Sequence, residues 1–337
     1  MWYRWRPNDQ RREGRCLRCA DATTQGSRPI QLRLPHSRIC RATGSIKVKP
    51  QHIPFPPWIR KGLSTGVQYH RTEGLLKRLD VDTICTQAHC PNQRECWEQG
   101  TATVLILGTI CTRNCPFCSV SHGIPELPDT EEPKRIAQLA SRLGIQYLVI
   151  TSVDRDDLAD GGASQFVAVV QACLEANPSM RFELLVPDFK GVQEKALEIL
   201  DRVQPFVFGH NVETVPELYP VARPGGDYVR SLELLSLARL RWPDVPVKSS
   251  LMLGLGESES QVRRVLQDLR DRGCDRLCLG QYLKPSKDSL EVKEFVHPEQ
   301  FARWAQEAEA MGFTWVLSEP FARSSYHAQD ATHSGGK

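Results

Sequence analysis

Six of the twelve cysteines in this chain lie between positions 85 and 118. They form two triplets, Cys85-x4-Cys90-x5-Cys96 and Cys111-x3-Cys115-x2-Cys118. Neither triplet has the paired C-x2-C knuckles of a zinc ribbon. A secreted disulfide framework is not expected, because no apolar segment follows the basic N-terminal residues and 337 residues can form a full hydrophobic core. The clustered cysteines therefore indicate metal or redox chemistry.

The second triplet has the composition of an iron–sulfur site. Three thiolates within eight residues can bind three irons of a [4Fe–4S] cluster, and the fourth iron, which has no local cysteine, stays open to another ligand. An apolar run at 103–108 precedes the triplet and predicts a buried strand. The cluster would then lie in the loop after the first strand, at the end of a βα barrel where active sites are found.

This triplet, with Phe117 directly before its last cysteine, resembles the signature of the radical S-adenosylmethionine (SAM) superfamily. The resemblance implies that Cys111, Cys115 and Cys118 hold a catalytic cluster. It also implies that the open iron binds the amino and carboxylate groups of SAM, and that reductive cleavage of SAM gives a 5′-deoxyadenosyl radical.

The rest of the chain alternates predicted strands with predicted helices. Strands are expected at 103–108, 147–151, 182–186, 205–210, 247–253, 276–281 and 313–318, and helices at 133–143, 165–176, 192–201, 231–241, 260–272 and 298–311. Such alternation predicts an α/β fold with a parallel sheet and right-handed crossovers. The first six units resemble the partial (β/α)6 TIM-like barrel of the radical SAM superfamily. A doubly wound sheet is the alternative, because a sequence alone does not close a barrel.

Two predicted strands are followed by groups suited to a ligand. An acidic loop containing Asp154 and Arg155 follows the second strand, and at a barrel mouth it would suit a ribose and a charged substrate. Gly254-Leu-Gly256-Glu257 follows the fifth strand, where glycine lets the backbone approach a ligand closely. We predict that these five residues bind the cofactor; a solvated loop and an ordinary tight turn are the alternatives. At the end of the fourth strand, His210 and Asn211 could make structural hydrogen bonds or contact substrate.

The first triplet lies upstream of the predicted barrel and would hold a second [4Fe–4S] cluster through Cys85, Cys90 and Cys96. The two triplets together resemble the lipoyl synthase family, and the agreement runs from about Trp58 to His327, about four-fifths of the chain. It includes Cys90-Pro-Asn, Glu95-Cys96-Trp97, Gly100-Thr-Ala-Thr103, Ile106-Leu-Gly108, Cys111-Thr-Arg-Asn-Cys115, the segment 150–158, Val186-Pro-Asp-Phe189, the segment 211–216, Gly280-Gln-Tyr-Leu283 and Arg323-Ser-Ser-Tyr-His327.

The lipoyl synthase resemblance implies an unusual ligand for this auxiliary cluster. In the family a serine of the Arg-Ser-Ser-Tyr motif completes it; Ser324 and Ser325 are the candidates, and we choose Ser325. A hydroxyl is a poorer iron ligand than a thiolate, so it can leave when the cluster is consumed. The implied reaction is radical insertion of two sulfur atoms, supplied by the auxiliary cluster, at C6 and C8 of a protein-bound octanoyl-lysine.

The same resemblance implies the cofactors and partners. The cofactors are two [4Fe–4S] clusters and SAM, with two SAM molecules used for each lipoyl group. The substrates are octanoylated lipoyl carrier domains, in the acyltransferase subunits of 2-oxoacid dehydrogenases and in the carrier protein of glycine cleavage. A ferredoxin- or flavodoxin-type protein would donate the electrons.

The chain departs from the family pattern near two of these sites. Thr86-Gln87 replaces an acidic pair, and Gly209 replaces the usual Asn before His210. Neither position is a ligand, so the departures affect the tuning of the site and its substrate contacts. Cys173, Cys274 and Cys278 match no cluster motif and are expected to pack as small buried hydrophobes.

The net charge of the first 50 residues differs in sign from that of the rest of the chain. Residues 1–50 carry 12 Lys or Arg and three acids, a net charge of +9, which leaves −6 for the rest. We expect this tail to be disordered, and interpret it as a transit peptide, a nucleic-acid-binding arm or an upstream over-translation of a gene that starts near Val48. The predicted parts are the tail at 1–50, an N-terminal extension with the auxiliary motif at 51–103, the barrel at 104–312 and a C-terminal extension at 313–337.

The predicted location is the cytoplasm, or an organelle matrix or stroma if the tail is a transit peptide. No run of about 18 apolar residues exists, so a membrane span is not expected. Other functions stay open at this stage. A radical SAM enzyme that methylthiolates or otherwise modifies RNA fits the basic tail, but a net charge of −6 suits a phosphate backbone poorly, so nucleic acid is not expected as a partner. A two-cluster electron carrier normally has fully ligated clusters, and iron-to-zinc stoichiometry would distinguish a metal-stabilised structural protein.

Overall fold

The computed structural model describes residues 54–62 and 66–332, all of which belong to one compact unit, His52–Lys337. The basic tail at 1–50 lies outside the described residues. At the centre of the unit is a seven-stranded parallel sheet. Its strands are β1 (Val104–Ile106), β4 (Tyr147–Ser152), β5 (Arg181–Leu185), β6 (Val207–Gly209), β7 (Val247–Leu253), β8 (Arg276–Gln281) and β9 (Trp315–Ser318).

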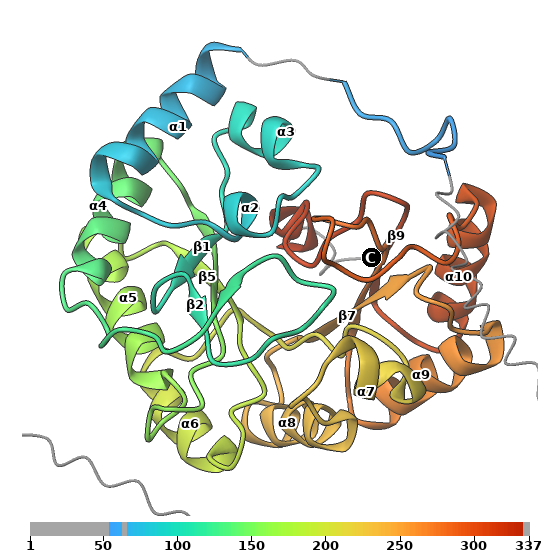
Figure 1. Cartoon of the computed structure of the whole chain (residues 1–337). Coiled ribbons are helices and arrows are strands. Elements are labelled where there is room, and N and C mark those ends of the chain that lie inside the picture. The colour runs from blue at the N-terminus through green and yellow to red at the C-terminus, as the bar shows by residue number, and fades with distance from the viewer. Residues whose placement is uncertain (1–53, 63–65, 333–337) are drawn as a thin grey trace, which may run out of the picture. The chain divides into compact units, whose positions relative to one another are not determined.

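The order of the strands distinguishes the barrel from the doubly wound alternative. Each strand pairs in parallel with the next one along the chain, from β1 through to β9. A doubly wound sheet would reverse this order at a switch point. The described strands show no reversal, so the sheet curls in one direction, and Figure 1 shows its helices following one another around the outside. The predicted α/β barrel of the radical SAM type is confirmed; β9, from the segment that we assigned to the C-terminal extension, adds a seventh strand.

The six predicted helices are present within a few residues, as α4, α5, α6, α8, α9 and α10, whereas α1, α2, α3 and α7 were not predicted. The largest difference is at α8, which begins three residues earlier than predicted because the Asp227 carboxylate accepts a hydrogen bond from Arg230 N and caps the helix there. The α-helices are α1 (Val67–Leu79), α2 (Ile84–Gln87), α3 (Gln93–Glu98), α4 (Glu132–Leu143), α5 (Ala163–Ala176), α6 (Gln193–Leu200), α7 (Tyr219–Ala222), α8 (Tyr228–Arg241), α9 (Glu259–Asp271) and α10 (Pro298–Ala310). Short 3-10 helices are η1 (Asp201–Val203), η2 (Pro216–Leu218) and η3 (Ala328–Thr332).

The ring of strands is open between β1 and β9, which are not paired with each other in the described residues. Figure 1 shows α2 and α3 beside the C-terminal chain in this opening, and a hydrogen bond of 2.7 Å from Asn92 Nδ2 to the Phe321 carbonyl joins the two segments. The N-terminal extension and the C-terminal chain therefore complete the barrel wall where the sheet does not.

Successive side chains of β4 point alternately into the hydrophobic core and into the barrel interior. Leu148 and Ile150 are almost fully buried in the hydrophobic cluster formed with the surrounding helices. Tyr147, Val149 and Thr151 line internal cavities instead. Successive side chains of a strand point to opposite faces, so one short strand both anchors the helical layer and shapes the interior.

The N-terminal end of the barrel contains a buried ion pair. Lys248 Nζ lies 2.8 Å from Glu183 Oε1, and both side chains are fully buried. The Tyr147 hydroxyl donates to Glu183 at 2.9 Å, and Lys248 Nζ lies 5.0 Å from the centre of the Trp315 ring. Charges this deep require such partners, because an unpaired one would lose its hydration without compensation.

Three cysteines outside the triplets are fully buried, as predicted: Cys173, Cys274 and Cys278. Among the residues that the structure describes, none of the helices has the length and apolar character needed to cross a membrane.

The C-terminal chain crosses β8 at Gly280. A Cβ added to this glycine would lie 2.1 Å from the Ala322 carbonyl oxygen and 3.0 Å from the Ala322 carbonyl carbon. Because the obstacle is backbone rather than a movable side chain, only glycine lets the segment that carries Arg-Ser-Ser-Tyr lie here.

We predict that Gly280→Ala lowers the free energy of unfolding by about 1–3 kcal/mol, the usual effect of overpacking a tight site. Denaturant unfolding would measure the change. The matched control is Gly74→Ala in α1, where the Cβ would meet only the Arg78 guanidinium, 3.2 Å away, and alanine favours the helix. Equal stability of Gly280→Ala and the wild type would contradict this account of the crossing.

Candidate active site with two cysteine triplets

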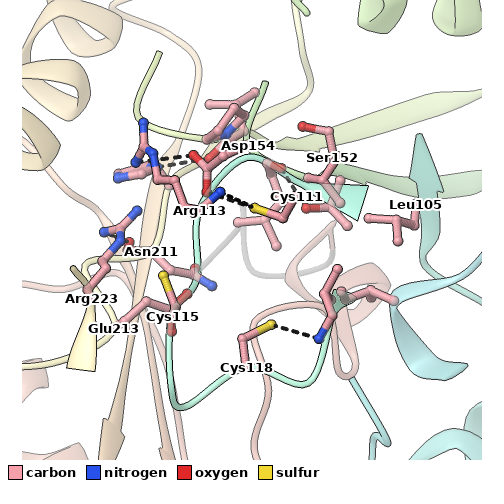
Figure 2. Close-up of a pocket in the computed structure, with 18 of the residues that line it drawn as sticks. Leu105, Cys111, Arg113, Cys115, Cys118, Ser152, Asp154, Asn211, Glu213 and Arg223 are labelled. Carbon is pink, nitrogen blue, oxygen red and sulfur yellow. Dashed lines mark hydrogen bonds and ion pairs between the residues drawn. The ribbon is translucent and has the colours of Figure 1, made fainter. Parts of the chain in front are cut away.

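A cavity of about 190 Å³ lies at the carboxyl ends of the strands, and the second triplet lines it (Figure 2). The cysteines of this triplet come from the loop after β1. Two short parallel strands, β2 (Ile110–Cys111) and β3 (Ser121–His122), pair at the two ends of this loop. The loop turns tightly, because Cys118 N donates to Cys115 O at 2.9 Å. This local closure brings Cys111, Cys115 and Cys118 to one cavity.

Arg113, inside this loop, joins it to the ends of two strands (Figure 2). Its Nε and Nη2 donate to Asp156 at 2.8 and 2.6 Å, Nη2 also lies 2.6 Å from Asp188 Oδ1, and Nη1 lies 3.2 Å from Asp154 Oδ1. Asp188 is fully buried, and its other oxygen accepts from Arg230 at 2.8 and 3.0 Å. Burial alone would raise the pKa of Asp188, but the hydrogen bonds and charge of Arg113 hold it well below its usual value.

Asp154 connects this network to the triplet. Its Oδ2 lies 3.8 Å from Cys111 Sγ, and its backbone carbonyl accepts from Thr112 N at 3.1 Å. Burial raises the pKa of Asp154, although Arg113 and Arg223 oppose the rise. Asp154 therefore presents a partly neutralised carboxylate to the cavity.

The three thiols of this cavity lie close enough to affect one another's ionisation. Burial raises the pKa of Cys115 to about 12 and that of Cys118 to about 11, and the charge of Cys111 contributes to both shifts. The buried cavity favours protonated thiols, whereas metal ligands must be deprotonated. A metal ion bound among these sulfurs would therefore displace their protons. Three converging soft ligands fit an iron–sulfur cluster.

A second cavity, of about 40 Å³, is lined by Cys85, Cys90 and Cys96 together with Ser325. Thr83 caps α2 by accepting from Thr86 N, and Cys90 N donates to Cys85 O at 3.0 Å, which folds the triplet back on itself. Burial, together with the charges of Cys85 and Cys90, raises the pKa of Cys96 to about 12. This second donor set also fits an iron–sulfur cluster, with the three cysteines and Ser325 lining a single space.

Of the two serines of the C-terminal motif, Ser325 lines a cavity and Ser324 bonds to a residue in the wall of the other. Ser324 Oγ donates to Asn211 Oδ1 at 3.0 Å, and Asn211 lines the first cavity. Ser325 lines the second. The preceding Arg323 also lines the second cavity, and its charge interacts with that of Glu213 in the wall of the first. Three consecutive residues thus connect the two sites.

Of the five residues that we predicted to bind the cofactor, only one lines the first cavity. Asp154 lines the first cavity, whereas Gly254, Gly256 and Glu257 do not. The Glu257 carboxylate instead accepts from Gly254 N and Leu255 N at 2.5 and 2.9 Å, and so closes its own turn.

Arg155 does not line the first cavity either. Its side chain is buried, but it donates to the Leu107 and Glu126 carbonyls and pairs with Asp157. The geometry therefore gives this arginine a role in fixing loops and provides no contact with the cavity.

The cavity contains charged residues that sequence reasoning did not single out. Arg113 and Glu213, which line the cavity, and Asp188, which pairs with Arg113, lie inside segments that carried the family resemblance. Arg223 also lines the cavity but lies outside those segments and far from any cysteine in sequence, so no local signal marked it. Burial raises the pKa of Glu213, and Arg223 opposes the rise.

His210 lines the first cavity, but both of its ring nitrogens have protein partners. It is almost fully buried, with Nδ1 2.9 Å from the Val186 carbonyl and Nε2 3.0 Å from Ser231 Oγ. Burial lowers its pKa to about 3, and the nearby cation Arg223 contributes. The other charged groups that affect it are Asp188 and Arg113.

We predict that, because of His210, the free energy of unfolding decreases as the pH is lowered below about 6.5. An unfolded histidine binds a proton near that pH, whereas the folded one does so only near 3, so unfolding takes up a proton in between. Between about pH 7 and pH 5.5 the wild type should lose ~1 kcal/mol more than His210→Gln, which cannot titrate. Denaturant unfolding at both pH values measures the difference, and equal losses in the two proteins would rule out this linkage.

Comparisons with known proteins agree with this geometry. The model of the radical SAM superfamily matches residues 105–269. The chain is 51% identical over 284 residues to the lipoyl synthase of Thiobacillus denitrificans, covering 84% of this chain and 91% of the relative. It is 49% identical over 292 residues to that of Nitrosococcus oceani, covering 87% and 90%. The chain belongs to the lipoyl synthase family.

The predictions of family, enzyme class and cofactors are confirmed. The chain is a radical SAM sulfurtransferase that forms lipoyl groups, with [4Fe–4S] clusters and SAM as cofactors and a lipoyl carrier protein as substrate. RNA modification, the alternative, is not the function of this family. Among solved structures, methylornithine synthase is similar at a TM-score of 0.46 and 14% identity, over 74% of this chain and 78% of that one, which adds nothing to the assignment.

Proposed function

We propose that the first cavity is the radical-generating site, with Cys111, Cys115 and Cys118 as ligands of one cluster. Cys85, Cys90, Cys96 and Ser325 are proposed as ligands of the auxiliary cluster. The observation that carries this assignment is that each triplet lines its own cavity while residues 323–325 reach both. The choice of Ser325 is supported because the Ser324 hydroxyl is already engaged by Asn211.

The charged groups of the first cavity suit the amino-acid end of SAM. Asp154 and Glu213 can accept hydrogen bonds from an ammonium group, and Arg223 can pair with a carboxylate. These residues are largely buried, so their interactions with a ligand are little screened by water. Gly254, Gly256, Glu257 and Arg155 are left out of this proposal because they are committed to their own loops.

The lining also contains apolar side chains, which suit a hydrocarbon chain. Ile84 and Leu105 are among them, and Ile84 is adjacent in sequence to Cys85 of the auxiliary triplet. When bound, SAM and the two clusters supply a carbon radical that can abstract hydrogen from an unactivated C–H bond, and the sulfur that replaces it. The protein orients the octanoyl chain and excludes water from it.

The carriers that we propose are the acyltransferase subunits of 2-oxoacid dehydrogenases and the carrier protein of glycine cleavage. The proposed electron donor is a ferredoxin- or flavodoxin-type protein. These finer assignments rest on the family to which the chain belongs and on its need for a reductant.

Two substitutions separate the roles of the triplets. Cys115→Ala should abolish formation of 5′-deoxyadenosine, because the radical site loses one of three sulfur ligands. Cys90→Ala should leave that cleavage measurable but stop dithiolane formation on an octanoyl-lysine peptide. Both proteins should bind about four irons against about eight in the wild type after anaerobic reconstitution.

The measurements are iron content, deoxyadenosine and modified peptide for each protein. Cys173→Ala is the matched control, since this buried cysteine lines neither cavity. Dithiolane product from Cys90→Ala would refute the sulfur-donor assignment, and unchanged SAM cleavage by Cys115→Ala would refute the radical site.

A further inference from the structure

The segment that carries Ser325 is held by side chains rather than by strand pairing. After β9 ends at Ser318, residues 319–327 form no further strand. Glu95, from α3, bridges this segment to the N-terminal extension: its Oε1 accepts from the Tyr326 hydroxyl at 2.7 Å, and its Oε2 accepts from Lys61 Nζ at 2.5 Å. We refer to Lys61, Glu95 and Tyr326 as the clasp.

Lys61 makes further contacts on both sides of this junction. Its Nζ donates to Asn92 Oδ1 at 2.6 Å, on the auxiliary loop. The same ammonium lies 4.7 Å from the centre of the Tyr326 ring and 5.2 Å from that of Phe321, within the range of cation–π attraction. One cation therefore joins two polar groups of the cysteine loop to two rings of the C-terminal segment.

The clasp lies directly beside the proposed auxiliary ligands. Glu95 directly precedes Cys96, and Tyr326 directly follows Ser325. Two of the three clasp residues are therefore adjacent in sequence to a proposed ligand. Asn92, also bonded to Lys61, is buried and lies between Cys90 and Cys96. A shift in the clasp would be transmitted to the Ser325 hydroxyl through a single peptide unit.

The ion pair of the clasp is partly accessible to solvent, unlike the one inside the barrel, although Tyr326 is buried. The Lys61 and Glu95 side chains are 24% and 36% exposed, whereas Lys248 and Glu183 are fully buried. Part-exposed pairs contribute little individually and can exchange with water, so the segment can be released without unfolding the barrel.

We propose that the clasp is a releasable positioning device that keeps Ser325 in the auxiliary cavity; this rests on the proposed function, in which Ser325 is a ligand. A hydroxyl binds iron more weakly than a thiolate, so contacts outside the metal site must contribute to holding it. Lys61 and Glu95 do not line the auxiliary cavity, and Tyr326, which does, uses its hydroxyl to bond Glu95; we therefore treat all three as positioning residues that act through Ser325.

The first test measures the segment itself in the reconstituted enzyme. Tyr326→Phe removes one hydroxyl, and Lys61→Met removes the charge but keeps an unbranched side chain. Amide hydrogen exchange at 321–327 should become about tenfold faster in both, since each loses contacts at a part-buried junction. Lys77→Met, which breaks an exposed pair with Glu73 in α1, is the control and should leave this segment unchanged.

The second test reports the ligand state of the auxiliary cluster by electron paramagnetic resonance, with Ser325→Ala as reference. The clasp variants should retain about eight irons, shift the auxiliary signal toward that of Ser325→Ala, and leave the radical-site signal as in the wild type. Lys61→Arg should restore the wild-type signal, because it keeps the cation against both rings.

The outcomes separate the two levels of the proposal. If Ser325→Ala alters the auxiliary signal but the clasp variants show wild-type exchange and spectra, the clasp is refuted and the ligand assignment stands. If Ser325→Ala itself gives the wild-type signal, Ser325 is not a ligand, and the role of the clasp fails with it.

Discussion

The arrangement of the first cavity depends on one buried arginine. Arg113 lies within the cysteine loop and is bound by carboxylates from the ends of two different strands, Asp154 and Asp156 after β4 and Asp188 after β5. A buried cation must be paired, so the loop cannot move away from the strands without leaving charges uncompensated. The loop is also held by its short β2–β3 pair and by hydrogen bonds from Thr112 N to the Asp154 carbonyl and from Leu290 N to the Pro116 carbonyl, but these are contacts between uncharged groups. Its cysteines are thereby positioned by the sheet.

A second constraint comes from the opening in the sheet. Because β1 and β9 do not pair in the described residues, the auxiliary cysteines and the C-terminal motif can enter the barrel wall at that point. Gly280 lets the C-terminal backbone cross β8 at close range, and the next residues reach both cavities. A fully closed barrel would have no room for a second site so near the first.

Sequence patterns predicted most of the fold and the metal-ligand candidates. Strands β7 and β8 were predicted to the residue, because continuous buried runs bounded by charged or glycine residues leave little ambiguity. Each cysteine triplet was recognisable because its ligands are close in sequence. Cofactor contacts were predicted less well. Strand ends indicate where a ligand could bind, but they do not show whether a carboxylate such as Glu257 is already used to close its own turn.

The sequence by itself determined the chemistry of this protein: two local cysteine triplets, an alternating βα pattern and a C-terminal serine pair. Spacing over a few residues fixes such features, so no knowledge of the fold was needed. Tertiary structure decided which serine faces the auxiliary cavity, how Arg113 is paired, and that Lys61 reaches Tyr326 from the other end of the chain. These contacts join segments far apart in sequence, and only the curvature of the sheet brings them together.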